Sequence, residues 1–103
     1  MKVHYFKGYY GRAESIRMIL FLNSQKFENV DYTFEEWGKV KHSGKFEFNQ
    51  LPALEADGQI FVQSSAILRY FAVKYNMYSN DPLTCWKIDS AVEAVADLGN
   101  FLG

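Results

Sequence analysis

The pair Asp57-Gly58 restricts the fold of this chain more than any other feature, because it lies between two short apolar runs. Asp-Gly between β-forming segments is the strongest short signal for a two-residue hairpin turn. Residues 53–56 and 60–62 are therefore predicted to be the paired strands of a hairpin. The chain has 103 residues, enough for one compact domain with a single core around this hairpin.

A strand-helix-strand unit is predicted before the hairpin. Residues 2–6 alternate and are rich in β-formers, residues 12–23 have helical apolar spacing, and residues 28–34 alternate again. The helical positions are Ile16, Ile19 and Leu20, and the alternating ones are Val30, Tyr32 and Phe34. Such a unit of about 30 residues favours a right-handed parallel pair of strands.

The remaining segments are predicted to be mainly helical. Residues 35–50 are polar with scattered aromatics and indicate an irregular connection or a weak helix. Residues 64–75 form a helix whose apolar face holds Ala66, Ile67, Tyr70 and Phe71. Asp81 and Pro82 suit the N-cap and first position of a last helix. Its apolar positions are Trp86, Ala91, Val92, Val95 and Leu98.

The order β-α-β, connection, β-β-α and one further helix predicts an α/β fold with a mixed four-stranded sheet covered by helices, as in thioredoxin-like folds. Composition excludes several other classes. The chain is 49% apolar and 17% aromatic, unlike a disordered tail, and its net charge of -1 gives no basic stripe for nucleic acid. No apolar stretch approaches the roughly 18 residues of a membrane span.

The single cysteine, Cys85, excludes an intramolecular disulfide and a multi-cysteine metal site. The first residues lack the apolar core of a secretory signal, so we expect a reducing, cytoplasmic location. The same cysteine count argues against thioredoxin-like redox catalysis, which needs a nucleophilic cysteine after the first strand. That region reads KGYYGR, and Cys85 lies in the last predicted helix.

Residues 51–65 combine two features that favour a ligand. Leu51, before Pro52, would offer its backbone groups as a short edge strand does, and Gln63-Ser64-Ser65 opens a helix whose N–H groups favour an anion. Together they predict a site for a peptide backbone and a carboxylate. Alternatively, Ser64 or Ser65 caps the helix and Pro52 ends a loop.

Six segments, in order, resemble the N-terminal domain of cytosolic glutathione transferases of the tyrosine-using classes (alpha, mu, pi and sigma). They are HYF, GRAESIRMIL, FEEW, NQLPALEADG, VQSSAILRY and KYNMY. The resemblance implies a thioredoxin-like, glutathione-binding domain over residues 1–78. Residues 79–103 would be a linker and the first helix of an all-helical second domain, most of which would lie beyond this sequence.

The resemblance implies that glutathione is a co-substrate and that no other cofactor or metal is used. Tyr5 would donate a hydrogen bond to the glutathione thiolate, with Arg12 beside the thiolate and the glycyl end. Lowering a thiol pKa from ~8.5 by about two units requires ~2.7 kcal/mol. One hydrogen bond to a charged group contributes ~1.5–3 kcal/mol, so one hydroxyl donor is sufficient. By themselves, Tyr5 reads as a core aromatic and Arg12 as an exposed residue at a helix start.

The resemblance assigns further contacts to glutathione. Trp37 and Lys41 would close over the glycyl carboxylate, although Trp37 could instead cover the core. Gln50, Leu51 and Pro52 would belong to the glutathione site, with the backbone of Leu51 bonded to the cysteinyl part.

The remaining assignments concern the γ-glutamyl end and the dimer. Gln63 and Ser64 would bind the γ-glutamyl group. Asp97 would reach the γ-glutamyl amine bound to a partner subunit, and Phe48 would insert into that subunit. Without the resemblance, Asp97 reads as a solvated helix acid and Phe48 as a local core contact. A homodimer is implied for a full-length form and not for these 103 residues alone.

The function implied is addition of the glutathione thiolate to small electrophiles, as in detoxification and glutathione metabolism. Two alternatives stay open: a non-catalytic glutathione-binding or interaction module, and a glutathione-dependent prostanoid isomerase, since GRAESIR and FEEW lean toward the sigma class. The loop between Phe6 and Gly11 looks one residue longer than the family pattern. We therefore expect that Arg12 could be displaced from Tyr5, with Tyr9 or Tyr10 as rival hydroxyls.

Overall fold

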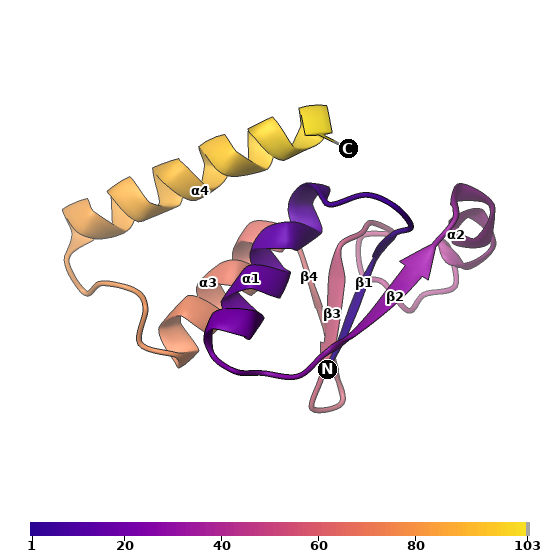
Figure 1. Ribbon diagram of the computed structural model, residues 1–103, viewed down its shortest axis with the longest axis horizontal. Coiled ribbons are helices and arrows are strands. Elements are labelled where there is room, and N and C mark those ends of the chain that lie inside the picture. Colours follow the sequence, from indigo (N-terminus) through magenta and orange to yellow (C-terminus); the bar gives the residue numbers. More distant parts are fainter. Residues whose placement is uncertain (103) are drawn as a thin grey trace.

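The computed structural model describes residues 1–102, and their side chains up to residue 97. Its centre is a mixed four-stranded sheet in the order β2-β1-β3-β4 (Figure 1). The strands are β1 (Lys2–Phe6), β2 (Glu28–Tyr32), β3 (Ala53–Ala56) and β4 (Gln59–Val62). β1 runs parallel to β2 and antiparallel to β3, and β3 and β4 form the hairpin at Asp57-Gly58. The predicted thioredoxin-like sheet is confirmed.

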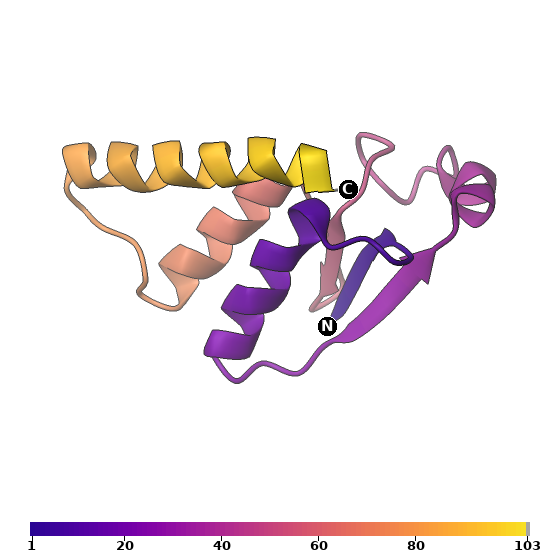
Figure 2. The ribbon, with the colours of Figure 1, turned by 45° about the horizontal axis from the view of Figure 1, so that its top comes forward.

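Helices lie on both faces of this sheet. They are the short 3-10 helix η1 (Gly11–Ala13), α1 (Glu14–Leu22), α2 (Phe34–Val40), α3 (Ser64–Lys74) and α4 (Pro82–Leu102). Figures 1 and 2 both show α1 and α3 side by side on one face, α2 beyond the end of β2, and α4 crossing over α1 and α3. None of the described helices has the length and apolar character needed to cross a membrane.

The face under α1 and α3 holds the main apolar core. Its buried members are Val3, Tyr5, Ala13, Ile16, Ile19, Leu20, Leu54, Ile67 and Phe71. The predicted inner face of α1 is therefore confirmed. The predicted face of α3 is partly wrong, because Ala66 is exposed and Tyr70 is 43% exposed. Ser64, Ile67 and Phe71 face the sheet instead, which places Tyr70 to the side, against the ring of Phe61.

The prediction that the second strand continues to Phe34 is wrong. β2 ends at Tyr32, and Thr33 is the N-cap of α2. The Thr33 hydroxyl accepts from the backbone N–H of Glu36 at 3.1 Å, and the Glu36 carboxylate accepts from the backbone N–H of Thr33 at 3.3 Å. This capping box turns the chain into a helix although the apolar alternation continues.

The opposite face, beneath α2, is lined by aromatic residues. Trp37 and Phe46 are buried there with Ala53, and Tyr32, Ile60 and Val62 pack against them. Trp37 comes from α2, whereas Phe46 comes from the irregular segment 41–50 that follows. The predicted connection over residues 35–50 thus consists of a short helix and a loop anchored by one buried ring.

α4 begins as predicted. The Asp81 carboxylate accepts from the backbone N–H of Thr84 at 2.9 Å, and this bond holds the pKa of Asp81 below its usual value. Its predicted apolar positions are poorly covered: Trp86 and Val95 are exposed and Val92 is half-buried. Ala91 is also exposed, and the side chain of Leu98 lies outside the described residues.

Candidate functional site

Tyr5 and Arg12 meet at the start of the first helical segment. Tyr5 lies on β1 with its side chain 6% exposed, and Arg12 belongs to η1. The backbone N–H of Arg12 donates to the Tyr5 hydroxyl at 3.2 Å. The loop between Phe6 and Gly11 therefore does not separate the two residues. Tyr9 and Tyr10 are exposed, and the Tyr9 ring packs against Phe34 instead.

Gln50 and Gln63 are joined although they stand on opposite sides of the hairpin. The side-chain amide of Gln63 donates to Oε1 of Gln50 at 3.2 Å. The Leu51–Pro52 peptide bond is cis, Pro52 is buried, and Leu51 packs against the apolar clusters of both faces. The hairpin thus brings the two predicted glutamine ligands together beside Leu51.

The start of α3 has an unusual backbone. Gln63, its N-cap residue, has φ 69° and ψ 109° and makes no side-chain capping bond. A non-glycine residue in such a region costs about 1–3 kcal/mol and is often found at functional sites. Ser64 is the buried first residue of α3, and Ser65 donates its hydroxyl to Glu93 on α4 at 2.9 Å. The alternative in which either serine caps the helix is therefore wrong.

A cavity of about 560 Å³ connects the two halves of the site. It lies between η1, α1, α3 and α4, and both Arg12 and Ser64 line it. Its apolar wall includes Met18, Ile19, Leu22, Leu68, Val92 and Val95. Four predicted residues are thus connected in space: Tyr5 contacts Arg12, Arg12 shares the cavity with Ser64, and Ser64 follows Gln63.

Other predicted ligands lie elsewhere. Trp37 is 7% exposed, and its indole packs against Phe46 with ring centroids 5.3 Å apart, so it covers the core as the alternative interpretation held. Lys41 is exposed at the C-cap of α2, and Phe48 is exposed in the following segment. Asp97 is exposed on α4. Ligand or subunit contacts of these four residues stay predictions.

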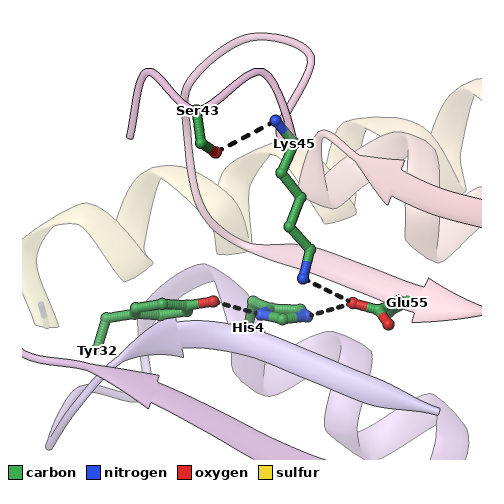
Figure 3. A network of polar contacts seen from close by, with 5 residues as sticks. All are labelled: His4, Tyr32, Ser43, Lys45 and Glu55. Atoms are coloured by element: carbon green, nitrogen blue, oxygen red, sulfur yellow. Dashed lines mark hydrogen bonds and ion pairs between the residues drawn. The ribbon is translucent and has the colours of Figure 1, made fainter. Parts of the chain in front are cut away.

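A polar network around the buried His4, under segment 41–50, was not predicted (Figure 3). His4, which is 2% exposed, lies between the Tyr32 hydroxyl at 2.8 Å and Oε1 of Glu55 at 3.1 Å. Lys45 Nζ lies 3.2 Å from the same Glu55 oxygen. Burial lowers the pKa of His4, while hydrogen bonds from Lys45 and His4 lower the pKa of Glu55. Its members come from distant segments, so no local sequence pattern indicates it.

Within residues 1–102, no three His, Cys, Asp or Glu side chains lie together in a way that could hold a metal ion. The residues brought together offer hydroxyl, amide and guanidinium groups beside a mixed sheet. Such groups suit a small polar peptide, and the architecture around them is that of a thioredoxin-like domain.

Comparison with known proteins identifies the family. The sequence model described as "Glutathione S-transferase, N-terminal domain" matches residues 1–73, and the chain belongs to this family. It is 40% identical over 102 residues to human glutathione S-transferase A3, covering 98% of this chain and 46% of that protein. It is 42% identical over 101 residues to bovine glutathione S-transferase A1, covering 97% of this chain and 45% of that protein.

Comparison with solved structures finds the same family. A Nu-class GST from Haemonchus contortus matches with a TM-score of 0.78 and 40% identity, covering 96% of this chain and 47% of that one. The chain thus spans about half the length of the relatives that it matches.

Proposed function

We propose that this chain is the glutathione-binding part of a glutathione transferase. It binds glutathione, holds the thiol as a thiolate, and presents it to small electrophiles. The observation that carries the proposal is the Tyr5 hydroxyl, which accepts the Arg12 backbone N–H at 3.2 Å. Family membership supports the same reading, since the matched domain contains both residues.

The hydrogen bond from Arg12 prepares Tyr5 as a donor. With its oxygen already accepting an N–H, the hydroxyl has a defined position, and its O–H is polarised by the bond it receives. Aimed at the glutathione sulfur, this O–H stabilises the thiolate more than the thiol. The thiolate then attacks an electrophilic carbon and forms a C–S bond. In a substitution the leaving group departs with the electron pair of its bond to that carbon, and in an addition the π pair moves to the neighbouring atom, which then takes a proton.

The peptide part of glutathione would be held next to Tyr5. The backbone of Leu51 would bind the cysteinyl part. The first N–H groups of α3, around Gln63 and Ser64, would bind the γ-glutamyl carboxylate, since a helix N-terminus favours anions. The bond between Gln63 and Gln50 supports this arrangement, because it holds both ends of the ligand site together.

The wider organisation follows from the same proposal. Residues 1–78 would form the glutathione-binding unit, and residues 79–103 the linker and first helix of a helical unit. The match over residues 1–73 supports that boundary. Phe48 would contact a second subunit in a homodimer, to which its exposed ring is suited. We place the protein in the cytoplasm, where its single free cysteine would stay reduced.

An ultraviolet difference titration of bound glutathione tests the proposal. We expect thiolate absorbance to appear well below the free thiol pKa of ~8.5 in the wild type, and nearer to that value in Tyr5→Phe. Tyr9→Phe is the matched control, because Tyr9 is exposed in the adjacent loop, and it should titrate like the wild type. Equal titration of Tyr5→Phe and wild type would remove Tyr5 as the donor.

Calorimetry separates binding from activation. Glutathione binding without a shifted thiolate would favour the non-catalytic binding module. Ser64→Ala should weaken binding by more than it lowers the free energy of unfolding, because Ser64 does not cap α3. An equal loss of both would assign Ser64 to folding alone.

A further inference from the structure

Segment 41–50 leads directly into Gln50 and Leu51 and has no regular secondary structure. Apart from the bond between Gln50 and Gln63, its described attachments to the sheet come from two neighbouring side chains. Phe46 is buried with its ring edge against His4, 5.5 Å between centroids, and Lys45 forms an ion pair with Glu55 on β3. Both attachments meet the His4 ring or its hydrogen-bond partner, and Figure 3 shows the one made by Lys45 and Glu55.

The chemistry of the network determines where the protons lie. The pKa of Glu55 is lowered by its bonds to Lys45 and His4, so its carboxylate only accepts, and Nε2 of His4 must carry the hydrogen. Burial lowers the pKa of His4, so the ring is neutral at pH 7, and Nδ1 accepts from the Tyr32 hydroxyl. One tautomer therefore satisfies both neighbours.

In this tautomer His4 contacts both attachments of the segment, the Phe46 ring directly and Lys45 through Glu55. The bond from Nε2 holds Oε1 of Glu55 in place, and Lys45 Nζ lies 3.2 Å from that same oxygen. The charged groups that act on His4 are Glu55, Lys45 and Lys2, and Tyr32 lies on its other side. Among residues 1–97, no buried side-chain nitrogen or oxygen lacks a hydrogen-bond partner. Removing the Tyr32 hydroxyl or the Glu55 carboxylate would therefore leave a ring nitrogen of the buried His4 without its partner.

We propose that His4 is a positioning residue of the glutathione site, which through Glu55 and Lys45 fixes segment 41–50 and so places Gln50 and Leu51 for the ligand. The inference rests on the proposed function, because it assumes that these residues bind glutathione. His4 and Tyr5 are consecutive on β1 and their side chains belong to opposite faces of the sheet. One strand would thus carry the thiol donor and hold the segment that aligns the peptide.

The first test compares two lysines. Lys45→Met removes the ion pair with Glu55, whereas Lys39→Met changes an exposed lysine on α2 whose nearest carboxylate oxygen, on Glu35, is 4.0 Å away. We expect Lys45→Met to weaken glutathione binding about three- to fivefold and Lys39→Met to leave it unchanged. Amide exchange at Asn49, whose N–H donates to the Phe46 carbonyl at 3.0 Å, should be faster in Lys45→Met only.

The second test asks whether a hydrogen-bonding side chain at position 4 restores glutathione binding. His4→Leu keeps an apolar side chain in the buried position but leaves the Glu55 and Tyr32 partners unsatisfied, and should weaken binding about tenfold. His4→Gln can still donate an amide N–H to Glu55 and should recover most of the affinity. A purely packing role would give the opposite order, because leucine is the better apolar filler.

The outcomes separate this inference from the function on which it rests. Weaker binding with faster Asn49 exchange in Lys45→Met, and rescue by His4→Gln, support it. If Lys45→Met matches Lys39→Met in both measurements, or if His4→Gln binds no better than His4→Leu, the inference is overturned while glutathione binding stands. If the wild type binds no glutathione although Asn49 exchange responds, the proposed function fails and the positioning role fails with it.

Discussion

The two faces of the sheet are covered by different types of side chain. Under α1 and α3 the core is apolar and mostly aliphatic, with Ile16, Leu20 and Leu54 fully buried. Under α2 it holds aromatic rings and the polar network around His4. β1 contributes to both, because successive side chains of a strand point to opposite faces.

This difference suggests that one face contributes most of the folding free energy and that the other fixes the positions of nearby segments. A buried aliphatic side chain contributes ~1.5–3 kcal/mol through area alone, with little dependence on its neighbours' orientation. A buried hydrogen bond contributes only ~0.5–1.5 kcal/mol net, but it requires one arrangement of its partners. We therefore expect the α1/α3 face to dominate the free energy of unfolding and the α2 face to determine where segment 41–50 lies.

The largest effect is expected on the aliphatic face. Phe71→Ala removes a ring that is 1% exposed between α3 and the sheet, and should lower the free energy of unfolding by about 3–5 kcal/mol. Urea denaturation followed by far-ultraviolet circular dichroism measures it. A loss below about 1 kcal/mol would contradict the assignment of this face as the main source of stability.

The next effect concerns the polar face and depends on pH. At about pH 7.5, His4→Leu should cost about 1–3 kcal/mol, because it removes the two hydrogen bonds that the buried ring makes with Tyr32 and Glu55. Burial lowers the folded-state pKa of His4, so the unfolded chain binds the proton more readily, and wild-type stability falls as the pH drops through 6.5. The gap between wild type and variant should therefore shrink on acidification. A gap that is equal at about pH 7.5 and about pH 5 would contradict a neutral, buried His4.

A smaller effect is expected at the start of α2. Thr33→Ala removes the hydroxyl that accepts from Glu36 and should cost about 1 kcal/mol. Thr33→Ser retains the hydroxyl and serves as the control, with a change of only a few tenths of a kcal/mol. Thermal unfolding of the wild type, Thr33→Ala and Thr33→Ser measures this contribution. Equal melting temperatures would show that the capping box does not stabilise the α2 face.

The smallest effect is expected on the solvent side of α2. Lys39→Met disrupts a pair with 4.0 Å between Nζ and the Glu35 oxygen, both groups largely exposed, and should change stability by less than about 0.5 kcal/mol. Denaturation at low and high salt should give the same result for this variant as for wild type. A clear salt-dependent loss would mean that surface charge contributes to the α2 face as well.

The parts of the fold that depend on local signals were predictable. The alternation of residues 2–6, the helical spacing of Ile16, Ile19 and Leu20, and the Asp57-Gly58 turn each involve neighbours in sequence. The start of α2 was also readable, since Thr33 and Glu36 form a capping signature, but the alternation that continues to Phe34 hid it.

The site was less accessible to sequence reasoning. Tyr5 and Arg12 were identified through the family resemblance, because one tyrosine among seven has no pattern that marks it as a donor. The backbone angles of Gln63 have no local signature in a residue type that seldom adopts them. His4 meets Tyr32 and Glu55 across separations of 28 and 51 residues, so their contact depends on how β1 aligns with β2 and β3.

The bond that reaches the Tyr5 hydroxyl starts from the main chain of Arg12 rather than from its guanidinium. Every amino acid except proline presents the same N–H, so this bond is indifferent to the identity of the residue at position 12. A substitution at position 12 that keeps the backbone in place can therefore keep this N–H donor while it changes the side chain. Position 12 thus has two separable properties: a backbone N–H that the fold directs at Tyr5, and a side chain whose type depends on the residue there.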